Sequence, residues 1–257
     1  MELIHWMIKR IRQAFLDKIY SANHLLNDRY QVEKVLGDGS YGIVYLCIEV
    51  NTKQKFVVKQ LRKSKKKENQ ELYKQEISIL RKLDHPSIPK LSETFTYENN
   101  KFFSMTFMDG VNLEDSLFKK KKKFNEKDAL LFFKKLVKLV SFIHDQGIAH
   151  RDLRIPNVII HHNQPYLIDF GLAELFKSDN KKEMVQDDFY DLGDFLLFIL
   201  YSTFDDKSKK NQPWTEELNL DNLTTRILKR LLQIEKPYAS AEEIQIDVNH
   251  ALKKFSS

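Results

Sequence analysis

The stretch IAHRDLRIPNVII spans residues 148–160, and the stretch LIDFG follows at residues 167–171. Both combine short apolar, β-prone runs with a polar break, which predicts strands joined by loops. The first break carries Asp152 and Asn157, and the second carries Asp169. The pattern therefore predicts a strand–loop–strand frame that exposes two carboxylates and an amide, which are hard oxygen ligands of the kind that magnesium prefers.

The two stretches resemble the catalytic and metal loops of the eukaryotic-type (Hanks-type) protein kinases, in particular the serine/threonine kinases of that type in bacteria. The resemblance implies that Asp152 orients the attacking hydroxyl and that Arg154 contacts the γ-phosphate. It also implies that Asn157 and Asp169 bind Mg²⁺, with Mn²⁺ as a substitute, beside ATP. Further along, Asp188 matches the buried aspartate that anchors the catalytic loop in this family.

A glycine motif, GDGSYG, occupies residues 37–42. The pattern G-x-G-x-x-G also occurs in dinucleotide folds, where a helix follows it, and in plain hairpin turns. Here the β-branched, apolar run 43–50 follows, which is a poor helix start. We therefore expect a hairpin tip at which Gly37, Gly39 and Gly42 let backbone amides approach the phosphates of the nucleotide.

A lysine and a glutamate are expected to face each other in the first half of the chain. Strand alternation places Lys59 on one face with Val57 and Leu61. In the helix expected after that strand, Glu76 shares the apolar stripe, because it lies four residues from a leucine on either side. Two charges on apolar faces predict an ion pair. It is either purely structural or the pair that orients the α- and β-phosphates in the kinase resemblance.

The stretch FSMTFMDGVNL, residues 103–113, resembles the hinge of the kinases. The resemblance implies that backbone groups of this stretch bind the adenine edge and that apolar side chains enclose the ring. The implied nucleotide-binding residues, besides the glycines and Lys59, are Val44, Val57, Met105, Thr106, Met108 and Ile159.

The order of predicted elements indicates an α+β, bilobal, kinase-like fold. Residues 1–28 are expected to form an amphipathic helical extension, because apolar residues recur there at spacings of three and four. Residues 29–108 are expected to form a small β-rich lobe with one helix, at about residues 67–83. Residues 109–257 are expected to form a larger, mainly helical lobe, with the hinge at about 106–109.

Composition narrows the partners and the compartment. The net charge of +6 comes largely from two lysine clusters, at residues 63–67 and 119–123. These favour solvated loops or the docking of an acidic protein substrate. No aromatic and arginine interleaving typical of nucleic-acid modules accompanies them. Cys47 is the single cysteine, which fits a buried strand thiol in the reducing cytoplasm. A peripheral membrane contact through residues 1–28 is an alternative that we do not favour.

The sequence departs from the family pattern in one region. Only sixteen residues, 172–187, separate Gly171 from Asp188, and they contain no A-P-E motif. The arginine that pairs with the glutamate of that motif is replaced by Tyr238. Loss of both partners leaves no buried charge stranded. Because Ser178 is the only hydroxyl residue in this segment, its phosphorylation and capture by Arg151 is a further hypothesis.

These features together favour an ATP-dependent protein kinase that transfers a phosphoryl group to a serine or threonine hydroxyl. The expected catalytic residues are Lys59, Glu76, Asp152 and Arg154. Two alternatives stay open. One is a pseudokinase, a nucleotide-binding scaffold that has lost peptide docking. The other is a small-molecule phosphotransferase on the same fold, which would explain the shortened segment.

Overall fold

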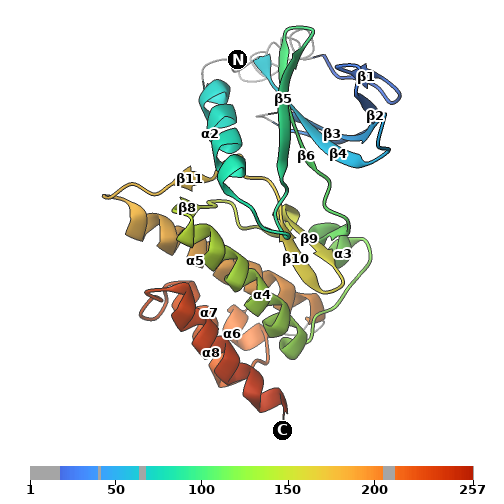
Figure 1. Cartoon of the computed structure of the whole chain (residues 1–257). Helices are drawn as coiled ribbons and strands as arrows, with labels where there is room; N and C mark the ends of the chain where they lie inside the picture. The colour runs from blue at the N-terminus through green and yellow to red at the C-terminus, as the bar shows by residue number, and fades with distance from the viewer. Residues whose placement is uncertain (1–17, 40–41, 64–67, 205–211, 257) are drawn as a thin grey trace, which may run out of the picture. The chain divides into compact units, whose positions relative to one another are not determined.

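The computed structural model describes residues 18–39, 42–63, 68–204 and 212–256. The chain divides into two compact units, residues 1–107 and 108–257. Figure 1 shows the elements of both units.

One antiparallel sheet forms most of the first unit. Its strands are β1 (Leu25–Leu26), β2 (Tyr30–Asp38), β3 (Gly42–Glu49), β4 (Lys55–Leu61), β5 (Leu91–Tyr97) and β6 (Asn100–Thr106). They lie in the order β1-β2-β3-β4-β6-β5, and every pair is antiparallel. The β-rich character expected of this part of the chain is therefore present.

Helix α2 (Glu68–Lys82) of the first unit packs against β4 and β5. It coincides with the helix predicted at about residues 67–83. Its buried stripe contains Glu76, Ile79 and Leu80, which are spaced by three and one and so share one side of the helix. The predicted presence of Glu76 on the apolar stripe is confirmed.

The core of the first unit lies on one face of the sheet. Alternate residues of β4, such as Val58, point into it. The cluster is rich in aromatic rings, and Phe102 on β6 stacks on Phe95 on β5 with ring centroids 5.1 Å apart. Cys47 on β3 is also buried there, and burial raises the pKa of its thiol to about 12. The predicted buried strand thiol is confirmed.

The predicted helical extension at residues 1–28 is corrected by the structure for its second part. Residues 1–17 lie outside the described residues, and residues 18–28 form turns and β1 but no helix. Tyr20 enters the aromatic core with 1% of its surface exposed. Ile19, which shared the expected apolar stripe, is 52% exposed. Burial of the Tyr20 ring in the core therefore overrides the helical period of the sequence here.

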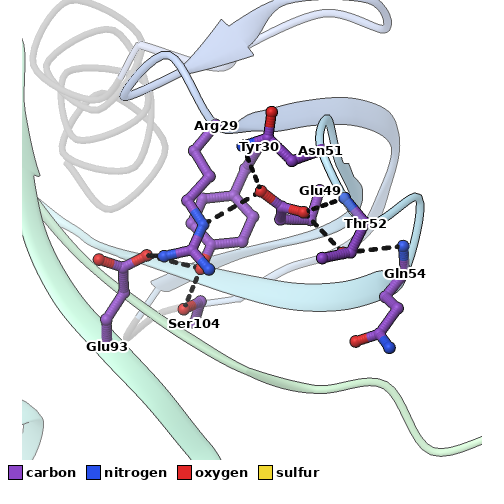
Figure 2. Close-up of polar contacts among 8 residues, drawn as sticks. All are labelled: Arg29, Tyr30, Glu49, Asn51, Thr52, Gln54, Glu93 and Ser104. Carbon is purple, nitrogen blue, oxygen red and sulfur yellow. Dashed lines mark hydrogen bonds and ion pairs between the residues drawn. The ribbon is translucent and has the colours of Figure 1, made fainter.

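A cluster of polar side chains joins β2 to β5 and stabilises the β3–β4 turn (Figure 2). The Tyr30 hydroxyl donates to Glu93 at 2.7 Å, and Arg29 donates to the same carboxylate at 2.7 Å. Glu49, at the end of β3, accepts from both the backbone N–H and the hydroxyl of Thr52 at 2.6 Å. These bonds lower the pKa of Glu49 to about 2, so the carboxylate is ionised and closes the β3–β4 turn.

The second unit is mainly helical. Its helices are α3 (Leu113–Phe118), α4 (Glu126–Asp145), α5 (Lys181–Leu200), α6 (Trp214–Glu217), α7 (Asn222–Leu231) and α8 (Ala241–Lys253). In Figure 1, α4 lies along α5, and both α5 and α8 contact α7. None of the helices in the described ranges has both the length and the apolar character needed to cross a bilayer.

Short strands carry the loops of the second unit. A three-stranded sheet joins β10 (Gln164–Leu167), β9 (Val158–His161) and β7 (Val111–Asn112). A separate pair joins β11 (Glu174–Leu175) to β8 (Ile148–Ala149). The 3-10 turn η2 (Ile155–Asn157) leads directly into β9. The predicted strand–loop–strand frame around residues 148–171 is therefore present.

Candidate active site

The glycine motif forms a β2–β3 hairpin, as predicted, and no helix follows it. Residues 40 and 41 of its tip lie outside the described residues. The Gly39 N–H donates to the Gly42 carbonyl at 3.1 Å. A Cβ atom at Gly42 would meet the Gln60 carbonyl oxygen at 2.8 Å. Gly42 therefore lacks a side chain because β4 passes too close.

Arg62, which the sequence analysis did not single out, holds the base of this hairpin. Its Nε donates to the Gly39 carbonyl at 2.6 Å, and its guanidinium also pairs with Asp38. Arg62 is buried at the end of β4. In the sequence, a basic residue directly after a strand is only a weak signal for this contact. The carbonyl that Arg62 bonds lies more than twenty residues earlier in the chain.

The predicted ion pair between Lys59 and Glu76 is confirmed. The Lys59 Nζ lies 2.7 Å and 2.8 Å from the two oxygens of Glu76. The two side chains are 11% and 5% exposed. The strand β4 and the helix α2 thus join two buried charges, each of which would be costly alone.

The strand register places four predicted nucleotide-binding residues on one face of the sheet. Val44 on β3 is the cross-strand partner of Lys59. Val57, two residues before Lys59, is the partner of Met105 on β6. Because cross-strand partners point to the same side, Val44, Lys59 and Val57 share a face with Met105. This face is opposite to the aromatic core.

The predicted hinge includes the point at which the two units divide, between Phe107 and Met108. Thr106 closes β6, where its N–H donates to the Lys90 carbonyl at 3.0 Å and its hydroxyl accepts from the Lys90 N–H at 2.9 Å. Met108 is half-buried. Ile159, on β9 of the second unit, is half-buried and pairs with Tyr166 and Asn112.

The catalytic-loop candidates of the second unit come together around Asp152. Arg154 donates to both of its carboxylate oxygens, with one nitrogen at 2.9 Å from Oδ2. The Asn157 amide nitrogen donates to Oδ2 at 2.7 Å and to the Asp152 carbonyl at 2.9 Å. Asp152, Arg154 and Asn157 therefore form one hydrogen-bonded group, and the bond to Asp152 raises the pKa of Arg154.

Asp188 anchors this loop, as expected. It is fully buried in α5, and it accepts from the backbone N–H groups of His150 and Arg151 at 2.9 Å and 2.7 Å. His144 on α4 bonds the same carboxylate at 2.7 Å. A buried carboxylate with three hydrogen bonds is well satisfied, so helix α5 fixes the start of the loop.

The loop that carries Asp169 is tied to the catalytic loop by backbone and by packing. The Ile168 N–H donates to the Asn157 carbonyl at 2.9 Å. Asp169 is exposed and has a left-handed backbone, with φ of 61°, which its Oδ1 supports by accepting from the Gly171 N–H at 3.2 Å. The residue before Asp169 is therefore hydrogen-bonded to the backbone of Asn157, which connects the two loops directly.

Two buried rings behind these loops were not singled out from the sequence. The Phe170 ring packs edge-on against the His150 ring, with centroids 4.9 Å apart. Burial lowers the pKa of His150, which favours a neutral ring. The contact therefore joins His150, two residues before Asp152, to Phe170, the residue directly after Asp169. Only the apolar neighbours of His150 in the sequence could have hinted at it.

The short segment 172–187 is held against β8. The Phe176 N–H donates to the Gly147 carbonyl at 2.7 Å, and β11 pairs with β8. Arg151 has a left-handed backbone, with a φ of 61°. Its guanidinium lies 3.5 Å from Glu174 and 3.9 Å from Asp187. Carboxylates of the segment itself therefore face Arg151, while Ser178 is exposed.

Tyr238, the residue found in place of the family's arginine, is buried with 1% exposed. Its carbonyl accepts from the Gln186 side chain of α5 at 2.7 Å, and its hydroxyl donates to Asp247 at 2.8 Å. The Arg230 guanidinium lies over its ring, 3.7 Å from the centroid. The hydrogen bond from Gln186 thus connects α5 to the segment between α7 and α8.

Three comparisons place this arrangement among known proteins. The protein kinase domain family matches residues 30–191. This chain is 39% identical over 254 residues to the probable serine/threonine-protein kinase YbdM of Bacillus subtilis (strain 168), covering 97% of this chain and 99% of that protein. The chain belongs to the protein kinase family. It is therefore an ATP-dependent transferase that acts on proteins.

Other relatives of this kinase agree. It is 32% identical over 161 residues to the human serine/threonine-protein kinase DCLK3, covering 61% of this chain and 24% of that protein. The crystal structure of the PF14_0431 kinase domain aligns with a TM-score of 0.71 at 17% identity, covering 90% of this chain and 97% of that one. The second likeness concerns the fold alone, and the predicted α+β, kinase-like fold is confirmed.

Proposed function

We propose that this kinase transfers the γ-phosphate of ATP to serine or threonine hydroxyls, with Asp152 as the residue that orients the attacking oxygen. The observation that carries the proposal is the hydrogen-bonded group of Asp152, Arg154 and Asn157 in a loop anchored by Asp188. Phosphoryl transfer depends mainly on positioning and charge. A carboxylate held by bonds to two neighbours meets the first need.

The nucleotide side of the reaction is assigned to the first unit. Lys59, oriented by Glu76, would contact the α- and β-phosphates. Val44 and Val57 would cover the adenine ring, and Met105 would limit the pocket. The glycines at residues 37, 39 and 42 would present backbone amides to the phosphates.

Magnesium fits the residues that the second unit offers. Asn157 uses its amide nitrogen for two bonds to Asp152, which leaves its amide oxygen as the ligand atom. Asp169 adds a carboxylate on the neighbouring loop. These are hard oxygen donors, and magnesium needs only one or two protein ligands when phosphates complete its shell. When bound, the cation neutralises phosphate charge, and Asn157 and Asp169 would position it.

The decisive test uses labelled Mg-ATP with the purified kinase, a mixture of general protein substrates and a metabolite extract. Label on serine or threonine of protein is expected. Label on tyrosine would reassign the acceptor, and label only on small molecules would favour a small-molecule phosphotransferase. ATP binding without any transfer would favour a pseudokinase.

Asp152→Asn is the informative variant of this test, because it keeps the shape of the side chain and removes its charge. We expect kcat to fall about 10²–10⁴-fold, with ATP binding retained. Asp145→Asn, at an exposed position at the end of α4, is the matched control and should change nothing. Equal label in both variants would refute the role of Asp152.

We further propose that the substrate protein is acidic and docks on the second unit. A hollow of about 330 Å³ lies between the end of α3 and the end of α5. Phe118 and Phe198, which are 61% and 49% exposed, pack edge-to-face at its rim. Lys121, Lys122 and Lys123 line it together with Phe204. Aromatic walls beside these basic side chains suit an acidic segment with an apolar anchor.

The docking proposal is tested by reversing charge in the hollow. Lys121→Glu with Lys123→Glu should raise the KM for an acidic protein substrate and leave the KM for ATP unchanged. Lys138→Glu with Lys253→Glu, at exposed positions on α4 and α8, is the control that changes the net charge by the same amount. If both variants raise the KM equally, the effect comes from overall charge and docking in the hollow is wrong. Most of the other lysine cluster, residues 64–67, lies outside the described residues.

We also propose which lobe binds the nucleotide, which lobe carries the catalytic loop, and that the kinase resides in the cytoplasm. Residues 29–108 form the nucleotide-binding lobe and residues 109–257 the catalytic lobe. The single cysteine is a buried thiol, which suits the cytoplasm. Fluorescent fusion of the full chain would test the location, and accumulation at the membrane would contradict it.

A further inference from the structure

Helix α5 contributes a second carboxylate to the catalytic loop. Asp191 lies one turn after Asp188, and its Oδ2 accepts from the Leu153 N–H at 3.1 Å. Asp188 holds the amides of residues 150 and 151. The two acids of one helix therefore bond backbone amides on both sides of Asp152.

The bond from Leu153 acts on a particular peptide group. The peptide between residues 152 and 153 carries the Asp152 carbonyl and the Leu153 N–H in one plane. Its carbonyl accepts from the Asn157 side chain at 2.9 Å and from the Arg154 N–H at 2.9 Å. Its N–H donates to Asp191. Because both ends of the plane are bonded, its rotation about the Asp152 backbone is restricted.

The surroundings of Asp191 disfavour its ionised form. Burial raises the pKa of Asp191 to about 6, and the bond from Leu153 opposes that rise. Asp188 and Asp194 of α5, and Asp152 of the loop, add negative charge that raises it as well. The facing positive group is Arg154, whose pKa the charge of Asp191 raises. His144 of α4 bonds Asp188. The apolar Leu231, at the end of α7, and the following Leu232 lie against Gly193.

We infer that Asp191 is a positioning residue for phosphoryl transfer, which fixes the 152–153 peptide and so aims the Asp152 side chain at the acceptor hydroxyl. A costly carboxylate beside the catalytic loop is explained by this task, since strongly perturbed acids cluster at functional sites. The inference rests on the proposed function of Asp152.

Asp191→Leu tests the role by removing the acceptor while keeping a side chain that branches at the same carbon. We expect kcat to fall about 10- to 100-fold with the KM for ATP unchanged, as a misaimed group can cost 10²-fold. Asp191→Asn, which keeps an acceptor oxygen, should restore kcat to within about threefold at neutral pH, by the same argument. Asp194→Leu, one turn further along α5 and exposed, is the matched control.

Two further measurements complement the kinetics, and the second of them does not require Asp191→Leu to fold. In the ligand-free protein, hydrogen exchange of the peptide 150–157 should quicken in Asp191→Leu and stay unchanged in Asp194→Leu. The kcat of the wild type should fall by at most about threefold below about pH 6, because a protonated carboxyl is a neutral acceptor like the amide of Asp191→Asn, and Asp191→Asn should lack this step.

The outcomes separate the two proposals. If the wild type transfers no phosphate, the proposed function fails. If the wild type transfers phosphate but Asp191→Leu keeps its kcat and its exchange rate, the positioning role is overturned while the kinase activity stands. An acid step that persists unchanged in Asp191→Asn would also overturn it.

Discussion

Arg154 caps Asp152 in the ligand-free kinase. Its guanidinium donates to both oxygens of the carboxylate, at 2.9 Å for one of the pairs. The Arg154 side chain is 66% exposed while that of Asp152 is 17% exposed. A flexible cation on the open side of a half-buried acid can hold that acid in place and still move to meet an incoming phosphate.

Removal of this cation should slow the reaction. In Arg154→Ala we expect kcat/KM to fall about 10- to 100-fold, which corresponds to one hydrogen bond between charged groups. Arg154→Lys should retain activity to within about tenfold, because a lysine still supplies the charge without the fork. Steady-state kinetics with a protein substrate measure both. Equal losses in the two variants would mean that the fork geometry, and not the charge, is required.

The Lys59–Glu76 pair should be coupled in stability as well as in activity. Lys59→Met removes the buried ammonium group that pairs with Glu76, which should lower the free energy of unfolding by about 3–5 kcal/mol. Lys59→Met with Glu76→Leu should recover most of that loss, yet stay inactive. Urea unfolding and kinase assays of both single variants and the double variant test this.

Lys34→Met, at an exposed position on β2, is the control for the stability cycle. It should unfold like the wild type. A double variant that is no more stable than Lys59→Met would show that the two side chains are not coupled.

The acid stability of the first unit should depend on Glu49. Its pKa in the folded chain is lowered to about 2 from an ordinary 4.5, chiefly by bonds from Thr52. The carboxylate therefore stabilises the fold above about pH 4.5, and this contribution is lost as the pH falls toward 2. Glu49→Gln should have a lower Tm at pH 7 and a shallower loss of Tm between pH 5 and pH 2.

Thermal unfolding across this pH range provides the measurement. Glu33→Gln, exposed on β2, should follow the wild-type curve. A Glu49→Gln curve parallel to that of the wild type would contradict the role of Glu49.

Activity should not require a phosphate on Ser178. Arg151 already faces Glu174 and Asp187 at 3.5 Å and 3.9 Å, so the segment supplies the negative charge itself. We expect Ser178→Ala to retain kcat within about twofold. Glu174→Gln with Asp187→Asn should lower kcat modestly, because exposed ion pairs are worth about 0–1 kcal/mol each.

Mass spectrometry of the wild type would accompany these assays. Phosphate on Ser178 together with an inactive Ser178→Ala protein would restore the phosphorylation switch.

The sequence alone determined the features that depend on local period and on residue type. Alternation in β4 and the four-residue spacing in α2 were enough to pair Lys59 with Glu76. The glycine motif followed by a β-branched run was enough to predict a hairpin. Such patterns report which side of an element is buried, because strands repeat every two residues and helices every 3.6.

Only the tertiary structure decided which distant groups meet on those buried sides. The helical period of residues 1–28 did not reveal that Tyr20 enters the aromatic core. No pattern around Asp191 or Arg62 indicated the backbone atoms that they bond, Leu153 and Gly39. Every residue except proline carries the same backbone N–H and C=O groups. The partners of these groups are therefore set by how the elements pack in space, and the residue types around them do not indicate which partners they find.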